Sequence, residues 1–322
     1  MDKKLKQNYY SFIHKLLIKF NRLRFQNSIS KWIWNKTWEY SIRNYKGLIH
    51  FKLHGQSVLL NNGNPYPLFI NTFPKYNYPL IEIVYQTFKE SQKQIVYIDI
   101  GAATGDTMLL LFQKCPNMIS KFYCIDGDNE FHELQKENLK KHLNGVYIKQ
   151  MLSDKSNRKV NSLIRIHHGT ASSQGDTMIE SKTLDELFQF DYPINQLDLI
   201  KIDVDGLDGM IINGSFNLLN KFKCTLIFEW HPVLYKKTNN NVVEPFEALK
   251  SRGYNKFVFY DKYGNFSQYH TDISSEEIEA LNELCLKEIN DSEPHFDVIA
   301  IHNSKNLNIN ELISLNYSSS LN

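Results

Sequence analysis

Short apolar runs recur along the chain from about residue 95 to residue 301. Each run is rich in Val, Ile, Leu and Phe and is bounded by turn-forming or charged residues, which is typical of buried strands. Seven runs predict strands at residues 95–100, 121–125, 146–152, 197–202, 224–228, 257–260 and 296–301.

Apolar residues at helical spacing separate many of these runs. Predicted helices cover residues 80–90, 131–142, 205–219, 244–251 and 275–289. Strands that alternate with helices form parallel sheets through right-handed crossovers. The pattern therefore predicts an α/β fold, with a Rossmann-like, mostly parallel sheet of seven strands and helices on both faces.

The first 52 residues differ from the rest in charge and aromatic content, with twelve Lys and Arg residues against Asp2 and Glu39. Apolar residues at helical spacing predict an amphipathic helix here; they are Phe12, Ile13, Leu16, Leu17, Phe20 and Leu23. This helix either packs on the α/β domain or presents its basic face to a membrane surface or to a substrate. Trp32, Trp34 and Trp38 suit both interpretations.

Turn-forming residues mark the end of this segment. Asn, Gly and Pro dominate residues 61–67, and Pro74 and Pro79 follow shortly after. Such a cluster indicates a connection between two parts of the chain. We therefore expect a helical N-terminal extension at residues 1–78, the α/β domain at residues 79–303 and a polar tail at residues 304–322.

Charge and cysteine usage narrow the cellular setting. The formal charge of +2 over 322 residues is too small to create an overall electrostatic field that would attract nucleic acid. A charged partner would have to bind a local patch of charge. The four cysteines form no CxxC pair, which favours a reducing cytoplasm. The apolar run at residues 12–20 contains charges and is too short to span a bilayer. We expect a cytoplasmic protein, with peripheral contact at the inner face of the membrane as the alternative.

A glycine turn follows the first strand of the α/β domain. Asp99, Gly101, Ala102 and Gly105 stand in the order D-x-G-A-x-x-G at the carboxyl end of that strand, where open α/β sheets bind ligands. The dinucleotide pattern G-x-G-x-x-G is absent because its third position is Ala103. A purely structural turn is the alternative.

A carboxylate ends the second strand of the domain. Asp126 lies about twenty residues after Gly105, where an acid can accept hydrogen bonds from both ribose hydroxyls of a nucleoside. Asp128 is the competing candidate, but it precedes a predicted helix and is better explained as its N-cap. Ser153 and Asp154 follow the third strand, where Asp154 could accept the adenine amino proton or the two could simply build a turn.

Acidic residues and a histidine end the fourth and fifth strands. Asp203 and Asp205 follow the fourth strand, and Glu229 and His231 end the fifth. Neighbouring strand ends meet at one edge of a doubly wound sheet, so these groups can converge. Asp203, Asp205 and Glu229 could hold Mg²⁺, or Asp203, Glu229 and His231 could serve proton transfer. Helix capping and pairing with Lys201 are the structural alternative.

Three stretches resemble the FkbM-type methyltransferases. They are YIDIGAATGD at residues 97–106, SKTLDELF at residues 181–188, and LDLIKIDVDGLDGMIINGSFNLL at residues 197–219 followed by IFEWHP. Asp205 and Asp208 stand where the family often has Glu, and Asp126 with Gly127 replaces its usual glutamate-proline. The resemblance does not extend to residues 1–78.

The resemblance implies a class I methyltransferase fold, S-adenosylmethionine as cofactor, and O-methylation of a small-molecule or glycan acceptor. From their positions we assign Gly101, Gly105 and Asp126 to the cofactor and Asp99 to the cofactor's amino-acid end or its loop. Asp203, Glu229 and His231 are assigned to the acceptor side. A lipid-linked, protein or secondary-metabolite acceptor is the main alternative. A non-catalytic module and a nicotinamide-dependent oxidoreductase are weaker ones.

Overall fold

The computed structural model describes residues 2–167, 170–172, 175–287 and 294–314. In this part of the chain an eight-stranded sheet has the order β13-β12-β14-β11-β10-β3-β4-β5. Its strands are β3 (Ile95–Ile100), β4 (Ile119–Asp126), β5 (Gly145–Lys149), β10 (Leu199–Ile202), β11 (Thr225–Trp230), β12 (Tyr254–Asp261), β13 (Phe266–Thr271) and β14 (Phe296–His302). All seven predicted strands are present.

The sheet is mostly parallel, as predicted. Strands β5, β4, β3, β10 and β11 run parallel, whereas β14 is antiparallel to both β11 and β12. The eighth strand, β13, pairs antiparallel with β12 at the edge and corrects the predicted count of seven. Its sequence, FSQYHT, is partly exposed along its length and lacks the continuous apolar run by which the other strands were recognised.

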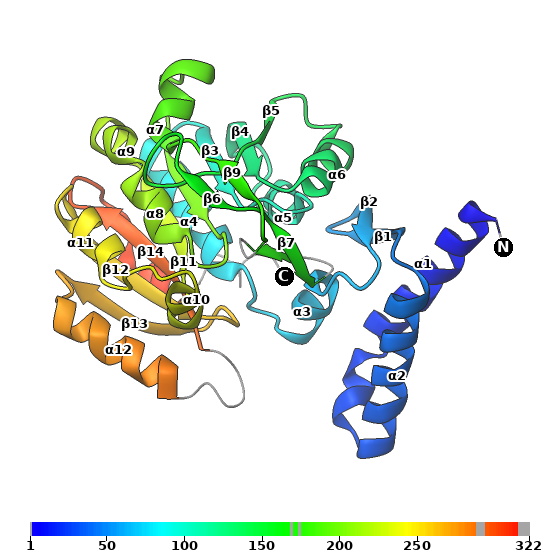
Figure 1. Cartoon of the computed structure of the whole chain (residues 1–322). Helices are drawn as coiled ribbons and strands as arrows, with labels where there is room; N and C mark the ends of the chain where they lie inside the picture. The colour runs from blue at the N-terminus through cyan, green and yellow to red at the C-terminus, as the bar shows by residue number, and fades with distance from the viewer. Residues whose placement is uncertain (1, 168–169, 173–174, 288–293, 315–322) are drawn as a thin grey trace.

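Helices cover both faces of this sheet (Figure 1). They are α4 (Tyr78–Ser91), α5 (Asp106–Lys114), α6 (Asn129–Leu139), α7 (Leu184–Glu186), η2 (Leu187–Asp191), α8 (Asp208–Asn213), α9 (Phe216–Phe222), α10 (Pro232–Lys237), α11 (Glu244–Lys250), α12 (Ser275–Lys287) and α14 (Ile309–Ser314). The helix predicted at residues 205–219 is interrupted at Gly214. A Cβ there would lie 2.2 Å from the Ser153 carbonyl oxygen, so the segment packs too closely for a larger residue.

Two apolar cores lie on the two faces because side chains alternate along each strand. Val96 and Ile98 of β3 join the core beneath α8, α9, α11 and α12. Ile95 and Tyr97 of the same strand join the core beneath α4 and α5. Residue-by-residue alternation thus lets one fully buried strand serve both layers.

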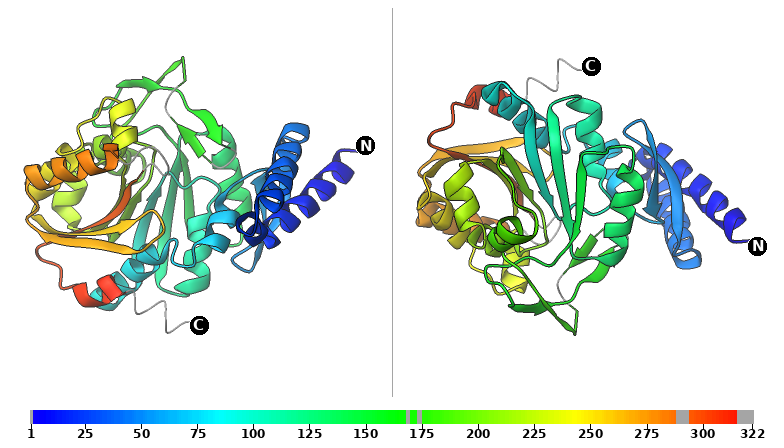
Figure 2. Two further views of the ribbon diagram at one scale, coloured as in Figure 1. Left: turned by 90° about the horizontal axis from the view of Figure 1, so that it is seen from below. Right: turned by 90° about the horizontal axis from the view of Figure 1, so that it is seen from above.

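The N-terminal extension combines two long helices with small elements. It contains α1 (Lys3–Lys19), η1 (Asn21–Phe25), α2 (Ser28–Asn44), the antiparallel pair β1 (Leu48–Leu53) and β2 (Gln56–Asn61), and α3 (Tyr66–Thr72). The predicted helical character is confirmed, and the β1–β2 hairpin is an addition. The α1–α2 hairpin lies at one side of the molecule in all views (Figures 1 and 2). In the described ranges no helix is both long and apolar enough to cross a membrane.

The extension shares a core with the α/β domain. Tyr10, Ile49 and Leu60 belong to the same apolar cluster as Leu109 of α5. Polar contacts add to it, because Asn138 of α6 pairs with the backbone of β2. Its side-chain amide donates to the Leu59 carbonyl (3.0 Å), and its oxygen accepts from the Leu59 N–H (2.8 Å). The proposed boundary near residue 78 stays a prediction.

Shorter strands complete the described chain. Strands β6 (Lys159–Asn161) and β9 (Met178–Glu180) form one antiparallel pair, and β7 (Ile164–His167) and β8 (Thr170–Ser172) form another. Only residues 304–314 of the predicted C-terminal tail are described, and they include α14; its remaining residues lie outside the described ranges.

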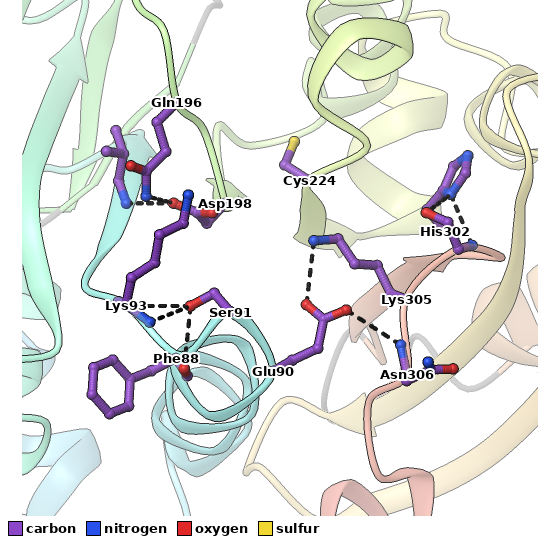
Figure 3. A network of polar contacts seen from close by, with 12 residues as sticks. Phe88, Glu90, Ser91, Lys93, Gln196, Asp198, Cys224, His302, Lys305 and Asn306 are labelled. Carbon is purple, nitrogen blue, oxygen red and sulfur yellow. Dashed lines mark hydrogen bonds and ion pairs between the residues drawn. The ribbon is translucent and has the colours of Figure 1, made fainter.

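A polar network fastens the amino-terminal edge of the parallel strands (Figure 3). The Asp198 carboxylate accepts from the Val96 N–H (2.8 Å) and from the Gln196 amide (2.6 Å). Glu90 at the end of α4 pairs with Lys305 at 3.3 Å. Polar side-chain contacts thus occupy the amino-terminal edge of the sheet. Open α/β sheets bind ligands at the opposite, carboxyl edge.

Replacing Asn138 tests how firmly the extension is attached. In Asn138→Ala two backbone groups of Leu59 and the Thr104 carbonyl lose a partner. We expect a loss of roughly 2–4 kcal/mol in the free energy of unfolding, measured by urea denaturation, because buried polar groups without partners are costly. The control Asn282→Ala on α12, which removes one surface hydrogen bond to Glu279 (3.2 Å), should change this free energy by less than about 0.5 kcal/mol. Equal effects of the two variants would contradict this attachment.

Candidate active site

A cavity of about 1150 Å³ opens at the carboxyl edge of the parallel strands. The ends of β3, β4, β10 and β11 form its floor through Gly101, Asp126, Asp203 and Glu229. Side chains of α2 and α3 form a further wall. Because the carboxyl ends of parallel strands meet there, residues far apart in the sequence become neighbours.

The glycine turn after β3 packs directly on the end of β10. Gly101 has φ +79°, and a Cβ on it would lie 1.8 Å from the Asp203 carbonyl oxygen. Its N–H donates to the Ile125 carbonyl at the end of β4 (2.9 Å). Gly101 and Ala103 line the cavity, whereas Ala102 is buried behind it. Gly105, with φ +80°, packs against Leu139 and starts α5.

Asp99 lies beneath the turn. It is fully buried, accepts a hydrogen bond from the Thr107 hydroxyl, and has Lys201 Nζ 3.6 Å away. Burial raises the pKa of its carboxyl group, and Lys201 opposes that effect. This position lets Asp99 hold the loop and the start of α5 in place.

Asp126 lines the cavity from the end of β4. Its carboxylate accepts from the backbone N–H groups of Ala103 (3.0 Å) and Asp128 (2.8 Å). Burial nevertheless raises the pKa of Asp126 to about 7. Asp128 caps α6 by accepting from the N–H groups of Glu130 and Phe131, both at 2.9 Å, so its interpretation as an N-cap is confirmed.

Ser153 and Asp154 point to other partners. The Ser153 hydroxyl is buried 2.7 Å from the Ser181 hydroxyl, and Asp154 forms an ion pair with Arg158 at 2.6 Å. The cavity is lined instead by the preceding residues, among them Met151 and Leu152. The predicted strand at residues 146–152 ends at Lys149, so the polar residues fall in a turn beyond the cavity.

Asp106 lines the cavity and was not among the predicted site residues. It is the first residue of α5, and burial raises its pKa to about 7. The available signal was its place in the failed G-x-G-x-x-G pattern, where it occupies the sixth position. In the sequence analysis only Ala103, at the third position, is used to argue against a dinucleotide site.

Asp203, Glu229 and His231 all line the cavity, so the structure brings the predicted acceptor-side residues together. Asp203 is half exposed and pairs with Lys201 at 2.9 Å. Glu229 is largely buried, and burial, followed by the charge of Asp203, raises its pKa well above the usual range. Burial lowers the pKa of His231 to about 3, so its imidazole is neutral at pH 7.

His295 completes this side of the site. Its Nε2 lies 3.5 Å from a Glu229 oxygen, and its ring stacks on that of His231 with centroids 4.5 Å apart. Sequence reasoning missed it, because it precedes the last predicted strand. That strand, β14, is antiparallel to β11, so its first residues return to the carboxyl edge where Glu229 and His231 lie.

The predicted Mg²⁺ ligands do not form a metal site. Within residues 2–167, 170–172, 175–287 and 294–314, no group of three or more His, Cys, Asp or Glu side chains is placed to hold a metal ion. Asp203 is paired with Lys201, Glu229 faces His295, and Asp205 sits on a left-handed turn with φ 54°. The three carboxylates therefore line one cavity without converging on a common point.

Aromatic side chains form another part of the cavity wall. Trp34 and Trp38 of α2 stack with centroids 5.1 Å apart, and the Arg24 guanidinium lies 4.3 Å from the Trp34 ring. Phe73 packs against Tyr263 at 4.2 Å. All five line the cavity, so the N-terminal extension contributes to the same site as the α/β domain.

The sequence model of the methyltransferase FkbM domain family matches residues 99–256. The matched region contains the glycine turn, Asp126, Asp203, Glu229 and His231. Over these residues the chain therefore matches the FkbM methyltransferase family, as the resemblance implied. No curated protein matches the sequence significantly.

Solved structures that are similar include several methyltransferases. Methyltransferase FkbM from Methylobacillus flagellatus has 11% identity and a TM-score of 0.40, covering 73% of this chain and 58% of that one. The plantazolicin methyltransferase BamL, solved with SAH and a triazolic desmethylPZN analog, has 12% identity and a TM-score of 0.38, covering 73% and 88%. Precorrin-6y C5,15-methyltransferase from Geobacter metallireducens has 14% identity and a TM-score of 0.34, covering 69% and 88%.

The close approach at Gly101 can be tested against a glycine with the same conformation. Gly55 also has φ +80°, but a Cβ there meets nothing within 4 Å. Gly55→Ala should therefore cost only the left-handed penalty of about 1–2 kcal/mol. Gly101→Ala should cost roughly 4 kcal/mol or more, because the new methyl collides with the backbone of Asp203. Urea denaturation measures the free energy of unfolding of both variants. Similar losses in Gly55→Ala and Gly101→Ala would show that the contact of Gly101 with β10 is not tight.

Proposed function

We propose that the protein transfers the methyl group of S-adenosylmethionine to a hydroxyl oxygen of a carbohydrate or glycoconjugate. The observation that carries this proposal is the single cavity that joins a nucleoside-type binding side, at Gly101 and Asp126, to a proton-accepting side, at Glu229 and His231. A transferase needs both, because its two substrates must meet in line.

The chain's own residues suit the cofactor. Gly101 exposes backbone to the cavity without a side chain, and each Asp126 oxygen keeps a lone pair after its backbone hydrogen bond, which ribose hydroxyls can use. Phe131, Met151 and Leu152 offer apolar surface beside Asp126 for a base ring. S-adenosylmethionine supplies a methyl group activated on a sulfonium.

His231 suits the role of proton acceptor. Its imidazole lines the cavity and is neutral at pH 7, because burial lowers its pKa to about 3. An acceptor hydroxyl in the cavity could donate to a nitrogen of this ring and pass its proton to it as the methyl group arrives. Burial raises the pKa of Glu229 well above its usual range, which favours its protonated form, and we assign it, with His295, to orienting the acceptor oxygen.

The lining favours a polar acceptor that also has apolar faces. Asn35, Glu39 and Asn77 offer hydrogen bonds, and Trp38, Phe69 and Tyr76 offer ring faces, all within the same cavity. Precise polar groups on an aromatic background are typical of small-molecule sites. A sugar combines hydroxyl groups with C–H faces and meets both demands.

Transfer of a radiolabelled methyl group tests the reaction. The purified full-length chain would be incubated with methyl-tritiated S-adenosylmethionine and a glycan fraction from the host cell surface. We expect label in the glycan that survives mild alkali, because methyl ethers resist it and methyl esters do not. Label lost in alkali would point to a carboxylate acceptor, and label found only in protein or lipid would contradict a glycan acceptor.

Asp126→Asn tests the cofactor side. We expect S-adenosylmethionine to bind about tenfold to 150-fold more weakly by calorimetry, the range for losing a charge-assisted hydrogen bond. The matched control is Asp128→Asn, two residues away, where Asn caps a helix as well as Asp does. Its affinity should equal that of the original protein, and equal affinity of Asp126→Asn would contradict the assignment.

The original protein and the Asp126→Asn variant can also be compared as a function of pH. Burial raises the pKa of Asp126 to about 7, so without ligand this carboxyl group stabilises the fold at low pH and loses that contribution as the pH rises through about 7. Accepting ribose hydroxyls needs the ionised form. The affinity ratio of the original protein to Asp126→Asn should therefore grow between about pH 6 and pH 8. A ratio independent of pH would contradict this role.

His231→Gln tests the proton acceptor. Glutamine keeps hydrogen-bonding capacity but cannot take up the proton, so we expect kcat to fall roughly 10²–10⁴-fold with unchanged S-adenosylmethionine affinity. His302→Gln is the control, because this buried histidine lies at the opposite edge of the sheet. A kcat unchanged in His231→Gln would assign the proton to another group.

A further inference from the structure

Large apolar side chains are unusually exposed on the α1–α2 hairpin. Of the eighteen such side chains in the described ranges, ten lie within the first 40 residues. They are Leu5, Tyr9, Phe12, Leu16, Phe20, Phe25, Ile29, Trp32, Ile33 and Tyr40. Single exposed apolar residues are ordinary on a protein surface, but a contiguous group of this size marks an interaction site.

On α1 these residues form one stripe. Leu5, Tyr9, Phe12, Leu16 and Phe20 recur every three or four residues, the spacing of one helix face. The buried residues of α1 occupy the opposite side of the helix and are Tyr10, Ser11, His14, Leu17 and Ile18. The helix is thus apolar on two sides, and the α/β domain and α2 use only one of them.

Helix α2 repeats the arrangement. Ile29, Ile33 and Tyr40 share one exposed face with Trp32 beside it, whereas Trp34 and Ser41 are buried on the opposite side. Phe25, between the helices, is 70% exposed. We call Phe20, Phe25, Ile29 and Trp32 the hairpin tip, since they lie around the connection between α1 and α2.

Positive charge surrounds the apolar residues. The segment from Lys3 to Lys46 carries eleven Lys and Arg residues and a single acid, Glu39, which pairs with Lys36 at 2.8 Å. Lys15 and Lys19 flank the α1 stripe, and Arg22 and Lys31 flank the hairpin tip. An apolar surface within a basic field matches the interface of an anionic bilayer, where aromatic rings enter the headgroup region and cations meet lipid phosphates.

We propose that the α1–α2 hairpin binds the surface of a bilayer that contains anionic lipid, with the hairpin tip inserted at the headgroup level. A second copy of the chain is a poorer occupant, because two such basic faces would repel each other. The binding does not depend on methyl transfer. The opposite face of α2 lines the cavity through Trp34 and Trp38, so bound protein would hold its acceptor site next to the lipid surface.

Cosedimentation with vesicles tests the proposal. The full-length chain would be mixed with vesicles of phosphatidylcholine alone or with about 30% phosphatidylglycerol. We expect binding to the anionic vesicles that weakens as salt is raised, because the charges are exposed. Absence of binding at low salt, or equal binding to both vesicles, would overturn the proposal.

Substitutions at the hairpin tip distinguish binding through this surface from nonspecific hydrophobic adsorption. A variant with Phe20→Ser, Phe25→Ser, Ile29→Ser and Trp32→Ser should bind at least about tenfold more weakly. The matched control changes exposed apolar residues elsewhere, with Leu143→Ser, Met178→Ser, Phe190→Ser and Leu284→Ser, and should bind like the original protein. Lys15→Gln, Lys19→Gln and Lys31→Gln should each cost about fivefold.

A measurement on the unaltered protein covers the case in which the four-residue variant fails to fold. Brominated lipids quench tryptophan at the headgroup and acyl level, so vesicle-bound protein should lose fluorescence, and Trp32→Phe should remove most of that quenching. Quenching that persists in Trp32→Phe would place the contact elsewhere. A dimer in light scattering that the tip variant dissociates, without vesicle binding, would assign the surface to a second copy.

Discussion

One buried cation holds the two halves of the site together. Lys201 on β10 stands directly opposite Asp99 on β3 and is only 8% exposed. Its Nζ lies 3.6 Å from Asp99 and 2.9 Å from Asp203. Although burial acts to lower the pKa of Lys201, the two carboxylates raise it above its usual value. A buried charge is tolerated only with such partners, so Lys201 needs the two carboxylates and the buried Asp99 needs Lys201.

The rest of the site follows from this triad. Asp99 orients Thr107 and the start of α5, which fixes the glycine turn over the end of β10. Asp203 is the residue whose carbonyl oxygen Gly101 approaches, so the turn can close only without a side chain at that position. The cofactor side and the acceptor side are therefore set at a fixed separation by neighbouring strands, as alignment of two substrates requires.

Burial also sets the protonation of the cavity. Asp106, Asp126 and Asp205 each have a pKa of about 7, and in each case burial is the first cause. The same burial lowers the pKa of His231 and keeps it neutral. A poorly hydrated cavity disfavours every charged form, so these acids exchange their protons near pH 7 while His231 stays neutral. The N-terminal extension contributes to this environment, because Trp34 and Trp38 wall off one side of the cavity.

The sequence by itself determined the strands, the direction of the sheet and the motifs at its carboxyl edge. Fully buried strands such as β3 need continuous apolar runs, and a turn such as that at Gly101 needs a residue without a Cβ, so both leave local signals. The tertiary structure alone decided which polar groups face the cavity. His295 enters through the antiparallel pairing of β14, Asp154 turns away to Arg158, and three carboxylates line one wall without meeting. The tertiary structure also decided the place of strand β13 and the exposure of the second apolar face of α1, because both depend on neighbours that are distant in sequence.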